Sequence, residues 1–562
     1  MEVAATAAAS GLRSFTFMKH VGMNVASDSF MTTAYSGVNG GMVILSADDP
    51  SLFSSQNEQD TRNYGRLANV PILEPSNCQE VKDMVKYAFD LSEQFKLPVI
   101  VRTTTRVSHM RGVVEFGEVV DNSSEGESHW KKGFFKKNPA QFVPVPAFAK
   151  DMHIALVEKM DEINKITNES DFNVESYFSQ DKKYGVIASS SAYHYAYDVI
   201  RYNNLDIDVL KLGFSYPFPY DKVADFVKDY DEVFIVEEVD PIIEKDTLVA
   251  IGKNNLNTVV HGKLDGTFPV YHEFNSDIVA NGFNKYLNFI EENTDDYSDN
   301  LLNLQEEIPS RAPVLCAGCP HRAMYYGVNK ALEELGIPLK DAVFASDIGC
   351  YTLGINPPYN AADYLLSMGS SVGDGCGFSI ATNQKVISFI GDSTFFHSGI
   401  SPLINAVHNK NNFILTVLDN RITAMTGGQP NPGIPVDGMG DDAPEISIRK
   451  LALACGCNYV RVINPLNLDQ VVKTYKEALE RDEVCVIIAK APCTLIKGKT
   501  RKPPVNYIDS NCNGCNKCVS ELACPAISKD GGKIAIDQSM CDGCGVCIQV
   551  CKYGALEAGR GE

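Results

Sequence analysis

Residues Val386-Ile-Ser-Phe-Ile-Gly-Asp-Ser393 and Phe413-Ile-Leu-Thr-Val-Leu-Asp-Asn420 each describe an apolar strand that ends in polar residues. Similar runs rich in β-branched residues recur along the chain and alternate with helical patterns, an order that predicts βαβ units and parallel sheets. The other predicted strands are Gly41 to Leu45, Leu97 to Val101, Tyr184 to Ala188, Glu232 to Val236 and Val484 to Ala489. The predicted fold class is α/β, with doubly wound parallel sheets.

The polar residues after the two strands predict a ligand site. Asp392 and Asn420 would stand at the carboxyl ends of two parallel strands, where doubly wound sheets bind ligands. Their oxygen atoms suit Mg²⁺ bridging a diphosphate, and the helix that begins after Gly391 would offer amide groups to phosphate oxygens. A Gly-Asp-Ser sequence alone is weak support, because most such turns are only turns.

Eight of the seventeen cysteines lie in two runs near the end of the chain. The runs are Cys512, Cys515, Cys518 and Cys524, followed by Cys541, Cys544, Cys547 and Cys551. Three cysteines spaced by two residues hold three corners of a [4Fe-4S] cube, and the fourth ligand comes from the other run. We therefore expect one cluster on Cys512, Cys515, Cys518 and Cys551, and a second on Cys541, Cys544, Cys547 and Cys524.

Zinc is the alternative for these cysteines, but zinc sites use pairs of Cys-x2-Cys rather than two triplets. Two features depart from the bacterial cluster pattern. Five residues separate Cys518 from Cys524 where that pattern has three, and Lys552 stands where a proline often follows Cys551. The cluster that includes Cys524 could therefore be altered or labile.

Length and charge limit the function further. At 562 residues the chain is long enough for three or four domains. Its net charge of −21 repels nucleic acid and anionic lipid, which leaves small molecules and proteins as partners. The sequence has no long apolar run and no signal peptide, so we expect a cytoplasmic protein that is not bound to a membrane. Iron-sulfur clusters rather than disulfides then account for the cysteines.

Polar stretches at 121–137, 291–307 and 497–504 predict breaks between domains. They divide the chain into segments 1–170, 171–300, 308–498 and 503–562. A helical pattern from Asp151 to Ile166 is expected to link the first two segments. The second segment contains no residues with obvious chemistry, and its Glu237-Glu238 is expected to be an exposed strand end.

Several longer motifs identify a family. They are Met18-Lys-His-Val-Gly-Met-Asn24, Ala47-Asp-Asp-Pro50, Ser54-Ser-Gln-Asn-Glu-Gln-Asp60, Val101-Arg-Thr-Thr-Thr-Arg-Val-Ser-His109, Cys316-Ala-Gly-Cys-Pro-His-Arg322, Ser346-Asp-Ile-Gly-Cys350 and Asp419-Asn-Arg-Ile-Thr-Ala-Met-Thr-Gly-Gly-Gln429. Together with the Gly391-Asp392 and Asn420 motif, they resemble the thiamine diphosphate-dependent 2-oxoacid:ferredoxin oxidoreductases, and most closely the large subunit of the indolepyruvate type. The resemblance covers nearly the whole chain.

The resemblance implies a role for each segment. In chain order they would be a pyrimidine-binding domain, a transketolase-C-like domain, a domain that binds thiamine diphosphate and magnesium, and an α+β ferredoxin-like domain with two [4Fe-4S] clusters. The side chains of Asp392 and Asn420 and the carbonyl of Ile422 would hold Mg²⁺. Gly391 and Ser393 would approach the diphosphate, whereas Thr423 and Thr426 would either contact the cofactor or only form a turn.

A third cluster is implied near the thiamine cofactor. Related oxidoreductases hold it with a Cys-x2-Cys near the start of this domain, an Ile-Gly-Cys turn and a Pro-Cys turn, which match Cys316, Cys319, Cys350 and Cys493. The alternative is that these are thiols without iron. Five other cysteines, in apolar or turn surroundings, are expected to be packed thiols: Cys78, Cys376, Cys455, Cys457 and Cys485.

Histidines and one arginine complete the candidate residues. His321 and His397 are the better candidates for moving protons near the cofactor, ahead of His20 and His109. Arg106 could face a substrate carboxylate or form a structural ion pair.

The start of the chain gives one further expectation. Glu2-Val3-Ala4-Ala5 resembles a helix that in the family follows the glutamate that protonates the aminopyrimidine ring. That glutamate would precede Met1, and Glu2 resembles a second, non-catalytic one. We expect either an incomplete start or an impaired enzyme.

The implied activity is oxidative decarboxylation of an aryl 2-oxoacid to acyl-CoA, with electrons passed through the clusters to ferredoxin. A small partner subunit and a hetero-oligomer are also implied. Two alternatives stay open. One is a pyruvate or branched-chain 2-oxoacid enzyme, and the other is a catalytically impaired electron-transfer subunit.

Overall fold

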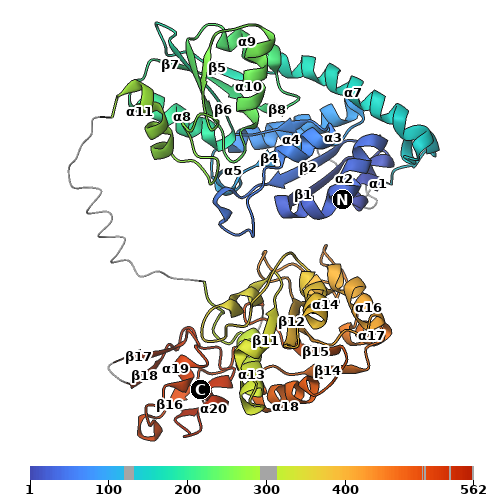
Figure 1. Cartoon of the computed structure of the whole chain (residues 1–562), viewed down its shortest axis with the longest axis vertical. Helices are drawn as coiled ribbons and strands as arrows, with labels where there is room; N and C mark the ends of the chain where they lie inside the picture. Colours follow the sequence, from blue (N-terminus) through green and yellow to red (C-terminus); the bar gives the residue numbers. More distant parts are fainter. Residues whose placement is uncertain (119–131, 291–312, 497, 499–500, 531–532, 560–562) are drawn as a thin grey trace. The chain divides into compact units, whose positions relative to one another are not determined.

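The computed structural model describes residues 1–118, 132–290, 313–496, 498, 501–530 and 533–559. They form two compact units, Met1–Ser298 and Asp299–Glu562 (Figure 1). The predicted breaks at 121–137 and 291–307 lie largely or wholly outside the described residues, as does part of the break at 497–504. Within the described ranges, no helix has the length and apolar character needed to span a membrane.

The first unit contains two five-stranded sheets. In the first sheet the strand order is β1-β2-β4-β3-β8, with β1 (Ser14–Lys19), β2 (Met42–Ala47), β4 (Val99–Thr103) and β3 (Ile72–Leu73) parallel. The helices of this part are α1 (Glu2–Ala9), α2 (His20–Ser36), α3 (Arg62–Ala68), α4 (Cys78–Phe95), α5 (Thr105–His109), α6 (Pro139–Phe142) and α7 (Pro146–Asn168). Buried residues of α2 and α4 pack with those of β2 and β4 in one core.

The second sheet has the order β10-β9-β6-β7-β5. Its strands are β10 (Val259–His261), β9 (Glu232–Val236), β6 (Tyr184–Ser189), β7 (Ile207–Leu212) and the antiparallel β5 (Val174–Ser176), and its helices are α8 (Ser190–Tyr202), α9 (Tyr220–Val227), α10 (Ile242–Lys253) and α11 (Ser276–Leu287). Strand β8 (Phe214–Tyr216) follows β7 in the chain but pairs with β3 of the first sheet. The chain thus leaves the second sheet after β7 to add β8 to the first sheet, a connection that sequence patterns did not predict.

The prediction for Glu237-Glu238 was wrong. Both residues are buried, with 1% and 4% of their surface exposed. The Glu238 carboxylate accepts hydrogen bonds from the Ser191 hydroxyl and the Phe274 amide, both at 2.9 Å. Glu237 Oε2 accepts a hydrogen bond from Arg62 Nη1 at 2.7 Å. Asp60 also pairs with Arg62, and Arg102 pairs with Asp48 and Glu74. This buried network of opposite charges ties the two halves of the unit together.

The second unit is built on a five-stranded parallel sheet in the order β11-β12-β13-β15-β14. The strands are β11 (Ala342–Ala345), β12 (Lys385–Gly391), β13 (Ile414–Asp419), β15 (Cys485–Lys490) and β14 (Tyr459–Ile463). Helices α13 (Pro320–Glu334) and α18 (Leu468–Leu479) share a core with one face of the sheet. Helices α14 (Ser370–Ala381), α16 (Ile400–His408) and α17 (Ile448–Ala454) share a second core with the other face. The doubly wound prediction is confirmed here.

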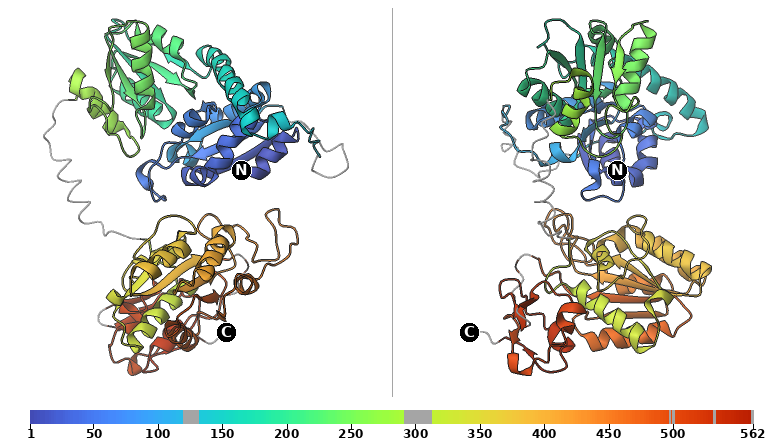
Figure 2. Two further views of the ribbon diagram at one scale, coloured as in Figure 1. Left: turned by 45° about the vertical axis from the view of Figure 1, so that its right-hand side comes forward. Right: turned by 60° about the vertical axis from the view of Figure 1, so that its left-hand side comes forward.

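The cysteine-rich end of the chain forms a small α+β module. It has two antiparallel strand pairs, β16 (Asn506–Tyr507) with β19 (Leu556–Glu557) and β17 (Ile527–Asp530) with β18 (Lys533–Ile536), and two short helices, α19 (Lys517–Ser520) and α20 (Val546–Val550). Its core continues onto the sheet domain through Ala323 of α13 and Leu468 of α18. The module therefore packs against α13 rather than standing free (Figure 2).

All seven predicted strands are present, with ends that differ from the predicted ones by at most two residues. The predicted helix from Asp151 to Ile166 is the central part of α7.

Candidate functional site

Asp392 and Asn420 lie at the same edge of the second unit's sheet. Strands β12 and β13 are adjacent and parallel, with Gly391 opposite Leu418, so both side chains follow the carboxyl ends of neighbouring strands. Asp392 accepts hydrogen bonds from the backbone amides of Ser393 at 2.8 Å and Arg421 at 2.9 Å. The Asn420 side-chain oxygen accepts one from the amide of Ile422 at 3.2 Å. These bonds fix both polar side chains at the sheet edge.

Asp419 is a second buried carboxylate at this edge, and the sequence prediction missed it. Burial, together with the nearby charge of Asp419, raises the pKa of Asp392 to about 6. Oδ1 of Asp419 is buried and has no hydrogen-bond partner among the described residues. Two buried carboxylates with an unsatisfied oxygen are the surroundings that a hard divalent cation would stabilise. The donors at this edge therefore fit Mg²⁺.

A neighbouring aromatic ring leaves no room for a side chain at position 391. A Cβ atom at this position would lie 2.8 Å from Cε1 of Tyr351. Tyr351 is buried and follows Cys350, and its hydroxyl donates to the carbonyl of Ile348 at 3.0 Å. The packing of Tyr351 on Gly391 thus places the Cys350 turn directly against the predicted diphosphate motif.

Asp347 is a further buried carboxylate that the sequence did not single out. It accepts hydrogen bonds from the amide of Gly369, at 2.8 and 2.7 Å, and from the amide of Ile348 at 2.7 Å. Burial raises its pKa to about 6. These bonds tie the Cys350 turn to the start of α14, so the residue has a clear structural role.

Thr423 and Thr426 lie in a tight turn after Asn420. The amide of Thr423 donates to the carbonyl of Gln429 at 2.9 Å, and the hydroxyl of Thr426 donates to the side-chain oxygen of Gln429 at 2.7 Å. Each therefore has a turn-forming bond. Ser393 is half-buried at the start of α15 (Asp392–Thr394).

The two candidate histidines have different environments. His397 is exposed and lies in a π-helical turn, Phe395–Gly399, that joins α15 to α16. Such turns often occur at functional sites. His321 is buried near Tyr351, edge-on to its ring at 6.1 Å between centroids, and burial lowers its pKa to about 4. His321 is therefore neutral at pH 7, able to donate one proton and accept another.

Among the candidate ligands of a third cluster, Cys316 and Cys493 lie within electrostatic range of Cys350. Burial raises the pKa of Cys350, and the neighbouring Cys493 and Cys316 thiols raise it further. The Cys319 amide donates to the carbonyl of Cys316 at 3.2 Å, which closes the Cys-x2-Cys turn. Cys376, Cys457 and Cys485 are buried, in agreement with their interpretation as packed thiols, whereas Cys78 and Cys455 are half-buried.

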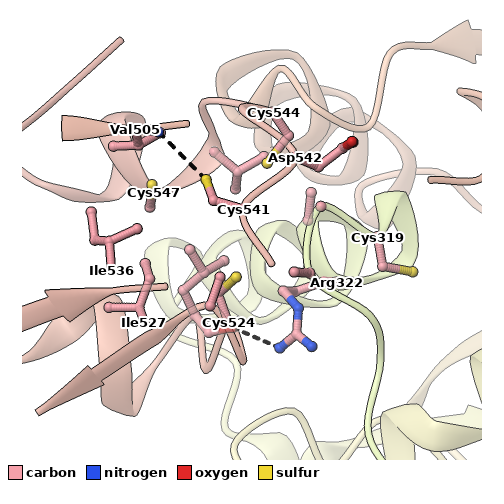
Figure 3. A pocket seen from close by; sticks show the side chains of 16 residues that line it. Cys319, Arg322, Val505, Cys524, Ile527, Ile536, Cys541, Asp542, Cys544 and Cys547 are labelled. Atoms are coloured by element: carbon pink, nitrogen blue, oxygen red, sulfur yellow. Dashed lines mark hydrogen bonds between the residues drawn. The ribbon is translucent and has the colours of Figure 1, made fainter. Parts of the chain in front are cut away.

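The cysteine-rich module contains two cavities, each lined by four cysteines from both runs. Cys524, Cys541, Cys544 and Cys547 line the first (Figure 3). Cys512, Cys515, Cys518 and Cys551 line the second. These are the two sets that the spacing predicted as cluster ligands. Among the described residues, no three Cys, His, Asp or Glu side chains converge closely enough to hold a single metal ion.

The first cavity also contacts the sheet domain. Ala317, Cys319 and Arg322 line it, so the predicted Cys-x2-Cys turn and the cysteine-rich module meet there. Only residues of the module line the second cavity. The two cavities thus differ in their distance from the sheet domain.

Candidate residues in the first unit have mainly structural contacts. The Arg106 guanidinium forms a forked pair with the carboxylate of Glu273, through Nε at 3.0 and 3.1 Å. His20 is buried and its Nε2 lies 3.1 Å from the carbonyl of Asn57. His109 is exposed. For Arg106, the structural ion pair is the alternative that the structure contains.

Three family models match the chain in the order of the sequence. Residues 1–180 match Pyruvate flavodoxin/ferredoxin oxidoreductase, thiamine diP-bdg. Residues 347–489 match the C-terminal TPP binding domain of thiamine pyrophosphate enzymes, and residues 504–552 match a 4Fe-4S dicluster domain. The fold and these matches define the class: a thiamine diphosphate-dependent oxidoreductase that carries iron-sulfur clusters.

Curated relatives narrow this class. The chain is 54% identical to the indolepyruvate oxidoreductase subunit IorA of Methanothermobacter marburgensis, over 99% of this chain and 88% of the relative. It is 41% identical to the subunit of that name from Pyrococcus horikoshii, over 100% of this chain and 88% of the relative. A more distant relative is the 2-oxoglutarate synthase subunit KorB of Methanocaldococcus jannaschii, at 27% identity over 38% of this chain and 82% of the relative. The chain belongs to the family of indolepyruvate oxidoreductase subunits IorA.

Proposed function

We propose that this chain is the large subunit of an enzyme that oxidatively decarboxylates aryl 2-oxoacids of the indolepyruvate type, giving acyl-CoA and CO2. Its electrons leave one at a time through iron-sulfur clusters to ferredoxin. One observation carries the proposal: the Cys316–Cys319 turn lies between the Cys350 turn, which packs on the Gly391 motif, and the cavity of Cys524, Cys541, Cys544 and Cys547. The decarboxylation edge and the electron path would thus be continuous within one unit.

The cofactor assignments follow from the donor atoms. Asp392, Asn420 and the carbonyl of Ile422 would hold Mg²⁺, with Gly391, Ser393 and Thr423 near the diphosphate. Bound thiamine diphosphate would supply the carbanion chemistry that releases CO2, while the protein binds and orients it. Neutral His321 and exposed His397 are the proposed proton carriers at this edge. The four segments keep their proposed boundaries, 1–170, 171–300, 308–498 and 503–562.

Three clusters would serve electron transfer. Two would occupy the cavities of the cysteine-rich module, and a third would be held by Cys316, Cys319, Cys350 and Cys493. Chemistry of this type requires an anaerobic environment for the purified enzyme, since exposed clusters oxidise. A small partner subunit would complete a hetero-oligomer, in agreement with the subunit names of the relatives.

Substrate-dependent reduction of a viologen dye tests the proposal. The chain is purified anaerobically with its partner subunit and supplied with coenzyme A, thiamine diphosphate and Mg²⁺. Indolepyruvate should be oxidised at least tenfold more efficiently than pyruvate or a branched-chain 2-oxoacid. A preference for either of the latter would favour that alternative. Dye reduction that depends on no 2-oxoacid, with clusters intact, would favour the electron-transfer subunit.

A further inference from the structure

Arg322 is a buried cation whose surroundings are incomplete. Its side chain belongs to α13, and only 4% of the residue is exposed. Nη1 donates to the hydroxyl of Tyr359 at 2.9 Å, to the carbonyl of Leu522 at 3.2 Å and to that of Ala523, while Nη2 donates to the carbonyl of Leu315. Nε is buried without a hydrogen-bond partner among the described residues. All of these acceptors are neutral.

Within the described parts of the chain, the other two buried arginines differ in this respect. Arg62 contacts the carboxylates of Asp60 and Glu237. Arg102 contacts those of Asp48 and Glu74. A buried charge is costly unless an opposite charge compensates it. The neutral acceptors of Arg322 therefore leave a positive charge that something anionic should balance.

The cavity of Cys524, Cys541, Cys544 and Cys547 is the place for that anion. Arg322 lines it together with the buried residue Asp542, and Figure 3 shows the guanidinium directed toward the chain at Cys524. A [4Fe-4S] core held by four thiolates carries net negative charge, which increases by one when the cluster accepts an electron. A nearby cation stabilises the reduced cluster more than the oxidised one, because Coulomb attraction grows with the charge.

The unusual cysteine spacing has a matching explanation. The loop between Cys518 and Cys524 is two residues longer than in the bacterial pattern. The carbonyls of Leu522 and Ala523 in this loop accept hydrogen bonds from Arg322. The hydroxyl of Tyr359 also donates to the carbonyl of Leu522. Ala523 has a positive φ of 46°, a conformation that these bonds hold in place. The longer loop thus attaches the cysteine-rich module to α13.

We propose that Arg322 is a positioning residue that anchors the Cys518–Cys524 loop to the sheet domain and raises the reduction potential of the cluster held by Cys524, Cys541, Cys544 and Cys547. This proposal rests on the cluster assignment of the proposed function. It makes this cluster the preferred acceptor of electrons from the sheet domain, ahead of the cluster in the second cavity. Each reduction adds one electron and leaves the cluster's thiolate ligands unchanged.

Redox titration of the full chain with its partner subunit, followed by electron paramagnetic resonance, tests the proposal. Arg322→Gln removes the charge and keeps a hydrogen-bond donor, Arg322→Lys keeps the charge, and Tyr359→Phe removes one anchoring hydroxyl. Arg322→Gln should make reduction of the Cys524 cluster at least tenfold less favourable, a decrease of about 59 mV or more for a one-electron couple. The cluster in the second cavity should change by less than threefold. Cys524→Ser, which removes the first cavity's signal, shows which signal is which.

The Arg322→Lys and Tyr359→Phe variants separate the effect of the charge from the effect of the hydrogen bonds that anchor the loop. Arg322→Lys and Tyr359→Phe should stay within threefold of the unchanged chain. An unshifted Arg322→Gln variant with full iron content would overturn the proposal. If the glutamine variant binds too little iron, the lysine variant decides, because a tenfold decrease with the charge intact would rule out tuning by charge. Arg481→Gln, which removes an exposed arginine of the same domain, is the matched control and should shift neither signal.

The unchanged chain distinguishes this proposal from the proposed function. If it contains no iron-sulfur signals, the cluster assignment fails and the role of Arg322 fails with it. If both signals are present and only the variant result is contrary, the cluster assignment stands and the role of Arg322 alone is refuted.

Discussion

The backbone amide of Cys493 donates a hydrogen bond to the carbonyl of Asn420 at 3.0 Å. This bond joins the Pro-Cys turn after β15 to the proposed magnesium motif after β13, two adjacent strands of the same sheet. Cys350 approaches from the other side, through Tyr351 packed on Gly391. A cluster held by these cysteines would therefore lie next to the diphosphate edge, and electrons would have only a short distance to travel.

A change at Cys350 should reveal whether that cluster exists. With three clusters the chain should bind about twelve iron atoms, and Cys350→Ala should reduce this to about eight. Anaerobic iron and sulfide analysis of the full chain provides the count. Cys376→Ala, which alters a buried thiol on α14, is the control and should leave iron unchanged. About eight iron atoms in both the unchanged chain and the Cys350 variant would mean that these cysteines are thiols without iron.

Asp392→Ala should abolish binding of thiamine diphosphate with Mg²⁺, because the diphosphate would lose the cation that compensates its charge. Isothermal titration calorimetry measures the affinity, and a loss of at least a hundredfold is expected. Iron content should not change. Asp482→Ala, at an exposed carboxylate that bonds Asn412, is the control. An Asp392 variant with normal affinity would remove this residue from the metal site.

Sequence patterns predicted the parallel sheets and the sets of cysteines because both depend on local spacing. A run such as Val386 to Ile390 is mostly apolar on both faces, which identifies a buried strand without knowledge of its neighbours. The cysteine triplets likewise contain three of four ligands in a single loop.

Features that depend on contacts between distant segments could not be predicted this way. The burial of Glu237 results from its contact with Arg62, which lies 175 residues earlier in the chain. Arg322 donates hydrogen bonds to the carbonyls of Leu522 and Ala523, which lie 200 and 201 residues later in the chain. Asp419 ends an apolar strand just before Asn420, a signal that could have been included in the predicted site. Nothing in the local pattern of β8 indicates that it pairs with β3.

Asp60→Asn should destabilise the first unit, and the size of this destabilisation should depend on pH. Burial alone would raise the pKa of Asp60, but Arg102 and Arg62 outweigh burial and hold it below its usual range. A lowered carboxyl pKa stabilises the folded state above pH 4, and this contribution is lost as pH falls toward the lowered pKa. Removing one partner of a buried ion pair costs about 3–5 kcal/mol. The variant should therefore be less stable by about this amount at pH 7, and the difference should shrink below pH 4.

Hydrogen exchange of peptides from residues 1–290 in increasing urea measures this stability separately from the second unit. Asp90→Asn is the matched control, because Asp90 also pairs with an arginine, Arg13, but at an exposed position. Exposed ion pairs contribute about 0–1 kcal/mol, so the control should have little effect. Equal effects of the two substitutions would contradict a special role for the buried network.

The two cysteine runs should interlock in their cluster chemistry as they do in the cavities. Cys551 lines the cavity of Cys512, and Cys524 lines the cavity of Cys541. Cys512→Ser and Cys551→Ser should therefore lose the same paramagnetic resonance signal and keep the other one. Cys524→Ser and Cys541→Ser, each made alone, should both lose the signal of the cluster in the first cavity. Each variant should lose up to about four iron atoms, the content of one cube. If Cys551→Ser instead lost the same signal as Cys541→Ser, each run would hold its own cluster. Only in that case would a substitution late in the second run leave the signal of the Cys512 cluster intact.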